Sequence, residues 1–478
     1  MFHSCLFSAL VTVASLALAT DAQSADWPMW RNDEQRSASS SSQLPEVLHL
    51  QWTRQLAAPV PAWPNEARLH FDASYEPIVL GSRMFVGSMI DGSVIALDTR
   101  SGEELWRFYT NGPVRLAPVA FDRRVCFGSD DGWLYCVDAV SGKLQWKVSG
   151  APVDRGAHWH LGNARLVSFW PVRGGPVVAD GVVYFGAGIW PTLGVFVRAV
   201  EARTGKIIWT NGNSHAIANV RVDHNYLQES GLSPQGHMLV QGDMLIVPNG
   251  RSMPARLDRK TGKLHYFVQG YRNGDSRVIV DRDIALVGRT GVVSLKDGRE
   301  IANRWTAAGK DAPAGWSSSK IDLFEGPIFP YKFQHACDYR SVIDNGIAYG
   351  LDNGTVHAYD LRTARTSSQK NKTFNGKDIQ PARWDATVLW TLKTPFSGKN
   401  LNTTTLLKAG TRLYAHSGRH LLAIQLAVAA DNPKLPGSIA WTRTLPAEPS
   451  SMLAANDRLF VVTADGTIRC FGANPGAP

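Results

Sequence analysis

Charged and amide side chains stand at the start of several short apolar runs in this 478-residue chain. Guanidinium groups pair with carboxylates through two parallel hydrogen bonds, and indole rings stack on planar or sugar-like molecules. Such residues around one opening predict a pocket for an anionic, planar or sugar-like ligand. The alternative is that the charges pair with one another inside a wet channel. The binding candidates are Arg115, Arg173, Trp170, Trp190, Arg251, Arg340 and Asn402, with the carboxylates of Glu76 and Asp338 beside them.

Two histidines, His158 and His160, form a further candidate because closely spaced imidazoles can share a metal ion. The sequence places no third ligand, so a surface histidine pair is the favoured interpretation. The chain also lacks a Gly-x-Ser-x-Gly elbow, a phosphate-binding loop, a His-Glu-x-x-His zinc motif and a Cys-x-x-Cys-His haem attachment. These absences favour binding over catalysis.

The elements that must position these side chains form an internal repeat. Residues 91–106 and 131–146 each contain an Asp-Gly turn, an alternating strand, a Ser-Gly turn and a short strand that ends in tryptophan. One copy is therefore half of a four-stranded antiparallel blade. Such a blade cannot bury both of its faces alone, so the repeat predicts blades stacked around an axis in a β-propeller.

The number of blades follows from counting the copies. Decayed versions of the pattern occur at 195–209, 255–266, 291–301, 353–390, 420–441 and 465–471. The last copy lacks its outer strand, whereas Leu48–Trp52 near the N-terminus is a strand without a partner. We therefore expect an all-β, eight-bladed propeller of four-stranded blades whose last blade is closed by the N-terminal strand.

The repeat also sorts the loops between two faces. Loops that enter a first strand, or join the second and third strands, share the face around the channel mouth. The insertions at 150–174, 210–233 and 304–339 fall mainly on that face, which predicts a binding surface there. The repeat residues have structural roles: Asp98, Asp138 and Asp258 are expected to cap turns, and Trp106, Trp146, Trp209 and Trp441 to wedge between blades.

The ends and the composition predict an exported protein. Residues 1–25 resemble a secretory signal peptide, and 26–478 are expected to form one propeller domain, periplasmic or secreted, with no transmembrane segment. The net charge of +9 is spread along the chain, which suits anionic polysaccharide or envelope partners or simply a basic soluble protein, and no nucleic acid. Cys126 and Cys136 flank one hairpin turn, and the sequence leaves both a disulfide and a reduced pair open.

The segment from Asp131 to Trp146 resembles the repeat of pyrroloquinoline quinone (PQQ) propellers. The opening residues 26–31 and the stretch 170–176 are also similar to secreted PQQ-like propellers of planctomycete-type bacteria. This family includes quinoprotein alcohol dehydrogenases and the lipoprotein of the outer-membrane β-barrel assembly machine, both eight-bladed. The resemblance implies the fold for nearly all of the chain after the signal peptide, but it is shared by binders and enzymes.

In the dehydrogenases the quinone lies on the channel axis over a tryptophan, beside calcium, with an aspartate as base and a disulfide between adjacent cysteines. The resemblance implies Asp338 or Glu76 as base or calcium ligand, and Arg340 or Arg173 as partner of the quinone carboxylates. This chain has no adjacent cysteine pair, and Cys5 precedes the apolar run, so no lipid-bearing cysteine follows it. The favoured hypothesis is a non-catalytic module that binds a small molecule, a glycan or an envelope protein. The alternatives are a PQQ- and calcium-dependent oxidoreductase and an outer-membrane assembly scaffold.

Overall fold

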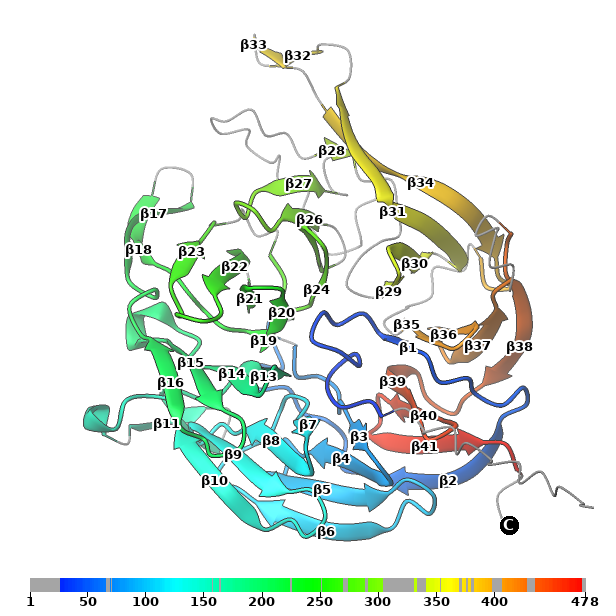
Figure 1. Cartoon of the computed structure of the whole chain (residues 1–478), viewed down its shortest axis with the longest axis horizontal. Coiled ribbons are helices and arrows are strands. Elements are labelled where there is room, and N and C mark those ends of the chain that lie inside the picture. Colours follow the sequence, from blue (N-terminus) through cyan, green and yellow to red (C-terminus); the bar gives the residue numbers. More distant parts are fainter. Residues whose placement is uncertain are drawn as a thin grey trace, which may run out of the picture.

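The computed structural model describes residues 26–474 apart from 66–68, 70, 157, 163–164, 224–225, 251, 270–273, 289–290, 304–330, 333–340, 353, 369–371, 375–376, 380–381, 398–405 and 428–434. Eight antiparallel sheets stand around a common axis (Figure 1), as the repeat predicts. In chain order, the first four blades are β3 (Ile78–Leu80), β4 (Arg83–Gly87), β5 (Ser93–Asp98) and β6 (Glu104–Tyr109); β7 (Val119–Phe121), β8 (Arg124–Gly128), β9 (Trp133–Asp138) and β10 (Leu144–Ser149); β13 (Gly174–Ala179), β14 (Val182–Ala187), β15 (Phe196–Glu201) and β16 (Ile207–Asn211); and β20 (Leu239–Gln241), β21 (Met244–Asn249), β22 (Ser252–Asp258) and β23 (Leu264–Tyr266).

The remaining four blades follow the same order from the axis outward. They are β24 (Val278–Asp281), β25 (Ile284–Val287), β26 (Gly291–Ser294) and β27 (Glu300–Asn303); β29 (Val342–Asp344), β30 (Ile347–Asp352), β31 (Thr355–Ser368) and β34 (Ala382–Lys393); β35 (Leu406–Ala409), β36 (Arg412–Ser417), β37 (His420–Gln425) and β38 (Ser438–Thr444); and β39 (Pro449–Ala455), β40 (Arg458–Thr463), β41 (Thr467–Gly472) and β2 (His49–Gln55).

The last blade is closed by the N-terminal strand, as the sequence predicts. Strand β2 pairs antiparallel with β41, with His49 opposite Gly472 and Trp52 opposite Cys470. The two ends of the ring are thus joined by backbone hydrogen bonds within one sheet, and neither β41 nor β2 leaves the ring open at this point.

The repeat tryptophans lock neighbouring blades together. The Trp106 indole N–H donates to the Ala139 carbonyl in the next blade at 3.1 Å, and the turn at Gly142 packs against the same ring. A Cβ atom on Gly142 would lie 2.7 Å from that ring, and the φ of Gly142 is +69°. Both the close contact and the backbone conformation therefore require glycine at this position. The Asp138 carboxylate accepts the backbone N–H groups of the same turn. Equivalent tryptophan bonds join Trp52 to Thr99, Trp146 to Ala202 and Trp209 to Arg259.

Residues 27–40 run around the middle of the ring, visible in dark blue in Figure 1. Their backbone groups bond in chain order to the innermost strands of six blades. The partners are Val79, Ala120, Val240, Val280, Ile343 and Lys408. Nothing in the sequence predicts this path, because the segment has no repeat pattern of its own. The N-terminal segment therefore satisfies inner-strand edges that would otherwise face the channel.

Arg36 ties this segment to the third and fourth blades. Its side chain is fully buried, and its guanidinium donates to the carbonyls of Pro176, Met238 and Trp30 at 2.6–3.2 Å. Burial lowers the pKa of Arg36 to about 9, and the nearby Asp33 and Glu34 carboxylates oppose that fall. At the third blade, the segment contacts the innermost strand through the Arg36 side chain, which binds the Pro176 carbonyl on β13.

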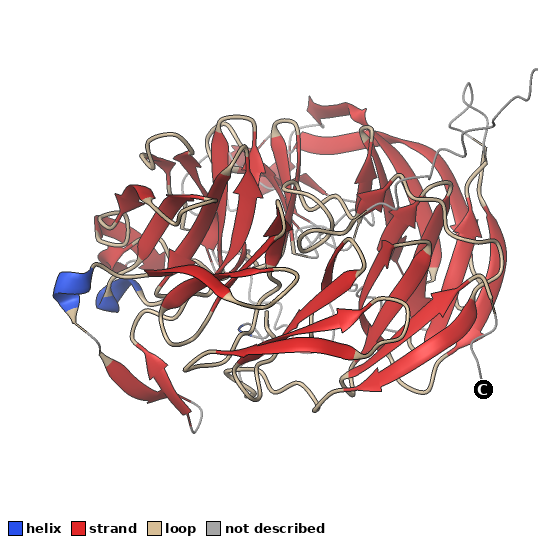
Figure 2. Ribbon diagram, turned by 60° about the horizontal axis from the view of Figure 1, so that its bottom comes forward, coloured by secondary structure: helices blue, strands red, loops and turns tan. Residues whose placement is uncertain are grey.

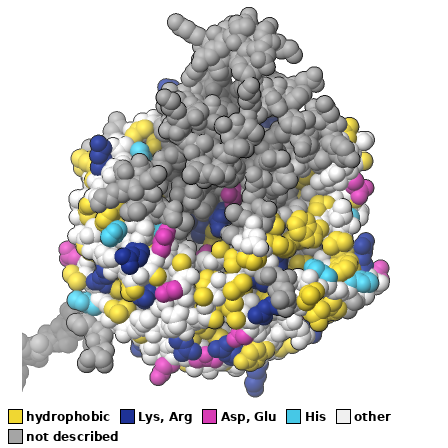
Figure 3. Space-filling model, turned by 180° about the vertical axis from the view of Figure 1, so that it is seen from behind, with side chains coloured by type: hydrophobic (Ala, Val, Ile, Leu, Met, Phe, Trp, Pro, Cys, Tyr) yellow, Lys and Arg dark blue, Asp and Glu magenta, His cyan; other side chains and the backbone are white. Residues whose placement is uncertain are grey.

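The insertions are small strands and turns added to the ring. They are β1 (Ser39–Ser40), β11 (Trp159–Gly162), β12 (Arg165–Ser168), β17 (Ile217–Asp223), β18 (Tyr226–Ser230), β19 (Gly236–His237), β28 (Tyr331–Lys332), β32 (Lys372–Phe374), β33 (Lys377–Ile379) and the 3-10 turns η2 (Val153–Arg155) and η3 (Pro191–Leu193). Strands dominate the molecule (Figure 2). Among the described residues no helix is long and apolar enough to cross a membrane. On the face seen in Figure 3, Lys and Arg lie interspersed with Asp and Glu over the described surface.

Candidate functional site

A cavity of about 190 Å³ lies between the N-terminal segment and the starts of innermost strands from several blades. We call it the axial cavity. Its walls come from residues far apart in the chain, which only ring closure brings together. The lining residues are Trp27, Trp30, Arg31, Ala38, Phe71, Ala73, Ser74, Glu76, Pro77, Arg277, Leu406, Ser450, Ser451 and Met452.

Glu76 provides a titratable acid in this cavity. It lies two residues before the start of β3, and its Oε2 accepts a 2.5 Å hydrogen bond from the Ser451 hydroxyl on β39. Burial raises the pKa of Glu76 to about 7, although the Ser451 bond and the charges of Arg277 and Arg31 act in the opposite direction. Near neutral pH the group is therefore divided between a carboxylate and a neutral acid that can donate a hydrogen bond.

Two guanidinium groups line the same space. Arg277 immediately precedes β24, and Arg31 belongs to the N-terminal segment. The Arg31 side chain is held in place by bonds to the carbonyls of Arg36 and Ser341. Among the described lining residues, two positive charges face one partly protonated acid, and the Asp275 carboxylate also interacts with Arg277. Such a lining favours a carboxylate or another small anion.

Trp30 is held rigidly beneath these charges. Its ring stacks on the His237 imidazole, with centroids 4.4 Å apart and planes 10° from parallel. The His237 Nε2 accepts the Ala117 backbone N–H at 3.1 Å, which places the imidazole proton on Nδ1. Burial, followed by the charges of Arg36 and Arg277, lowers the pKa of His237 well below its usual value. The imidazole is therefore neutral, and the aromatic pair carries no charge of its own.

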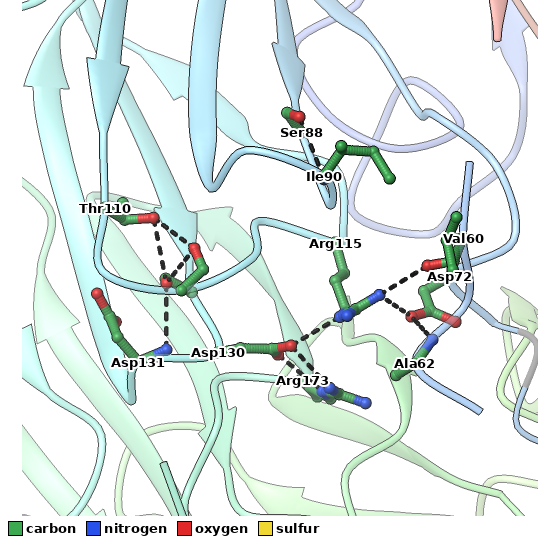
Figure 4. A network of polar contacts seen from close by, with 12 residues as sticks. Val60, Ala62, Asp72, Ser88, Ile90, Thr110, Arg115, Asp130, Asp131 and Arg173 are labelled. Carbon is green, nitrogen blue, oxygen red and sulfur yellow. Dashed lines mark hydrogen bonds and ion pairs between the residues drawn. The ribbon is translucent and has the colours of Figure 1, made fainter. Parts of the chain in front are cut away.

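Arg115 and Arg173 converge on a second group, which we call the clamp (Figure 4). Asp130 Oδ2 accepts from Arg115 Nε at 2.6 Å and from Arg173 Nη2 at 2.7 Å, and its Oδ1 accepts from Arg173 Nε at 2.8 Å. Arg115 Nη1 also reaches Asp72 Oδ2 at 2.9 Å. All four side chains are at most 4% exposed. Burial alone would raise the pKa of Asp130, but the two guanidinium groups outweigh it and hold the pKa below the ordinary value.

The clamp fastens the segment that links β2 to β3. Arg115 donates to the Val60 carbonyl at 3.1 Å, and the Arg173 guanidinium lies 4.4 Å from the Trp63 ring centroid. Asp72 also accepts the Ala62 backbone N–H at 2.9 Å. The residue before Asp72, Phe71, lines the axial cavity. The clamp therefore positions a wall of the cavity, and its two positive and two negative charges balance.

The predicted site residues are thus divided between several places. Glu76 lies in the axial cavity, and Arg115 and Arg173 lie in the clamp. Trp190 is 39% exposed and meets Trp63 edge to face at 5.9 Å. Trp170 is buried, and its indole N–H donates to the Leu193 carbonyl at 2.8 Å. Arg251, Asp338, Arg340 and Asn402 lie outside the described residues.

His158 and His160 are not among the described residues that line the axial cavity, and among those residues their ring contacts do not involve the clamp carboxylates. His158 and His160 contact the rings of Phe169 and Trp170. Within the described part of the chain, no three His, Cys, Asp or Glu side chains are grouped so as to hold a metal ion. The interpretation as a surface pair stays a prediction.

Four charged residues of these two groups were not predicted from the sequence. Arg277 immediately precedes an innermost strand, as Arg173 does, and the same rule applied to the fifth blade would have found it. Asp130 precedes the Asp-Gly turn at 131–132, where the repeat drew attention only to the turn itself. Arg31 and Asp72 carry no such signal, since they belong to segments outside the repeat.

A family model described as outer membrane protein assembly factor BamB matches residues 29–166 and 90–370, which together cover more than half of the chain. Among curated proteins, the chain is similar to the dehydrogenase subunit of quinone alcohol dehydrogenase from Gluconobacter oxydans, at 33% identity over 127 residues, 24% of this chain and 16% of that one. It is also similar to the quinohemoprotein alcohol dehydrogenase ADH IIB of Pseudomonas putida, at 30% identity over 122 residues, 22% of this chain and 18% of that one. The chain thus matches less than a fifth of the length of each of these two relatives.

Solved structures share the architecture. The quinohemoprotein alcohol dehydrogenase from Comamonas testosteroni matches with a TM-score of 0.56 and 17% identity over 95% of this chain and 82% of that chain. A europium-containing methanol dehydrogenase matches with a TM-score of 0.54 and 14% identity over 94% of this chain and 98% of that chain. At these identities the likeness establishes the fold and not the chemistry.

Proposed function

Because the chain belongs to the family of PQQ-repeat propellers whose model is described as outer membrane protein assembly factor BamB, we propose that it is a ligand-binding propeller. Its axial cavity takes a small carboxylate-bearing molecule and does not transform it. The observation that carries this proposal is the arrangement of Arg31, Arg277 and Glu76 around one cavity.

The charges of the lining support an anionic ligand. A ligand carboxylate can pair with guanidinium groups, and it can accept a hydrogen bond from Glu76 when that acid is neutral. The rings of Trp27, Trp30 and Phe71 give part of the lining an apolar surface, which strengthens such electrostatic contacts. A cavity of about 190 Å³ is smaller than the roughly 300–1,000 Å³ of pockets for drug-sized molecules. The ligand is therefore a small acid.

Binding of a panel of small mono- and dicarboxylates tests the proposal by isothermal titration calorimetry. We expect Arg277→Gln and Arg31→Gln each to weaken binding about tenfold, the effect of losing one charge-assisted bond. Arg203→Gln is the matched control, because Arg203 is 71% exposed and pairs with Asp122 on the surface. Binding that is equally strong in all three variants would place the ligand elsewhere.

A second candidate is a PQQ-dependent dehydrogenase, which the matches to quinone alcohol dehydrogenases favour. PQQ is a planar tricarboxylate, and the two guanidinium groups and aromatic rings of the axial cavity suit its charge. Calcium takes about 6–8 oxygen ligands, whereas the described lining offers one carboxylate, Glu76. The described residues thus fit the quinone in charge and do not fit the cation.

Dye reduction separates the two candidates. The protein is incubated with PQQ and either calcium or europium, and reduction of an artificial electron acceptor by primary alcohols is followed. The binding proposal predicts no reduction above a protein-free control. Turnover that requires both PQQ and the cation, and that falls in Arg277→Gln, would establish the dehydrogenase instead.

A further inference from the structure

Cys126 and Cys136 face each other directly across the β8–β9 hairpin of the second blade. The ladder fixes the type of this pair. Bonds from the Ser129 N–H to the Trp133 carbonyl and from the Ala139 N–H to the Arg123 carbonyl mark hydrogen-bonded positions on either side. Because such positions alternate along antiparallel strands, the cysteines occupy a non-hydrogen-bonded pair.

This position brings the two sulfur atoms within bonding range. Opposed Cα atoms in a non-hydrogen-bonded pair are about 4.5 Å apart, and disulfides span Cα separations of about 4.4–6.8 Å. The two thiols already contact each other through a hydrogen bond. Closing a disulfide therefore needs only a small side-chain rotation and no change of register.

We propose that Cys126 and Cys136 form a disulfide when the folding chain meets a disulfide oxidant such as oxidised glutathione. One thiolate attacks the glutathione disulfide and releases one glutathione as thiolate; the second cysteine then attacks the mixed disulfide and releases the other. The two thiol protons pass to solvent, and two electrons reduce the oxidant to two glutathione molecules. Both cysteines have no exposed surface, so the bond forms while the hairpin is open and is then shielded from reductants.

The bond would brace the hairpin that presents Asp130. The turn at its tip holds this carboxylate, which both Arg115 and Arg173 bind in the clamp. A covalent link three pairs below the tip restricts opening of the two strands. Cys470 serves as an internal reference, because it is buried opposite Trp52 and no described cysteine faces it.

Peptide mass spectrometry tests the proposal without any ligand, so its outcome is independent of the proposed function. The full chain is refolded in a glutathione redox buffer, denatured, alkylated without reduction and digested with trypsin. Cleavage after Arg124 and Lys143 places both cysteines in one peptide. We expect this peptide to be unalkylated and lighter by two hydrogen atoms, whereas the Cys470 peptide is alkylated.

Thermal unfolding gives a second readout. Wild-type protein refolded in dithiothreitol should have a Tm a few degrees below that of protein refolded in the glutathione buffer, whereas the Tm of a Cys126→Ala, Cys136→Ala double variant should not depend on the refolding buffer. A 125–143 peptide carrying two alkyl groups, a glutathione adduct as the final product, or a link from either cysteine to another part of the chain would overturn the proposal.

Discussion

The Ser451 hydroxyl of the last blade donates a 2.5 Å hydrogen bond to Glu76 Oε2 at the entrance to the first blade. This bond crosses the seam where the chain closes on itself, close to the sheet in which β2 completes the last blade. The same carboxyl group lines the axial cavity with Arg31 and Arg277. The candidate site is therefore complete only when the first and last blades are joined.

Ligand affinity should fall as the pH rises through about 7. Glu76 becomes an anion over that range, since its pKa is about 7, and the added charge repels a bound carboxylate. We expect wild-type affinity to fall about fivefold between pH 6 and pH 8, and Glu76→Gln to bind equally well at both values. Calorimetric titrations at matched ionic strength measure this. A wild-type affinity that rises with pH would contradict the assignment.

The same group predicts how stability depends on pH. In the unfolded chain Glu76 ionises near its ordinary pKa of 4.5, whereas in the folded protein it ionises near 7. Between these values the unfolded state binds fewer protons, so the free energy of unfolding falls as the pH rises, by about 1–3 kcal/mol in total. Urea unfolding of wild type and Glu76→Gln at pH 5 and pH 8 checks this. The substitution should remove that part of the decrease and leave the contributions of other groups.

Breaking the clamp should destabilise the protein strongly. Asp130→Ala leaves the Arg115 and Arg173 guanidinium groups buried without their shared carboxylate, and we expect a loss of about 3–5 kcal/mol. Asp122→Asn is the control: it removes the charge of a carboxylate that is 58% exposed in its pair with Arg203 and keeps a side chain that tolerates the positive φ at this position, so it should change stability by less than about 0.5 kcal/mol. Chemical denaturation with both variants decides the matter. Equal effects of the two substitutions would refute the structural role given to the clamp.

The glycine turns allow a matched test of the contact between blades. Gly142 and Gly181 have φ values of +69° and +75°, but only a Cβ on Gly142 would meet a tryptophan ring, whereas a Cβ on Gly181 meets nothing within 4 Å. Gly181→Ala should cost about 1 kcal/mol from backbone strain alone. Gly142→Ala should cost at least about 2 kcal/mol more, because Trp106 must move. Thermal denaturation of the pair measures the difference, and equal losses would show that the ring contact is unimportant.

Much of the architecture could be predicted because each clear copy of the repeat contains both a glycine turn and a tryptophan that a neighbouring blade contacts. Gly142 stands four residues before Trp146 in its own copy, as Gly205 does before Trp209, and each of these two glycines packs on the tryptophan of the preceding blade. The sequence pattern therefore reports a contact that joins blades. The closing role of β2 follows from the missing outer strand of the last copy. These features are periodic, and periodic features are visible in a single sequence.

The candidate site was predictable only in part. Glu76 follows from its position before β3, and Arg277 satisfies the same rule. The path of residues 27–40 does not follow from any local pattern, because their backbone partners belong to six blades spread over the chain. Arg31 therefore could not be placed at the cavity, and the pairing of Arg115 with Asp72 depends equally on a long loop without periodicity.

A crystal structure of the protein with the tightest-binding acid of the panel tests directly whether a carboxylate ligand occupies the axial cavity. We predict that the ligand carboxylate lies between Arg31 and Arg277 beside Glu76, with its remaining atoms against the rings of Trp27, Trp30 or Phe71. A cavity without the acid, or an acid bound outside it, would contradict the central claim.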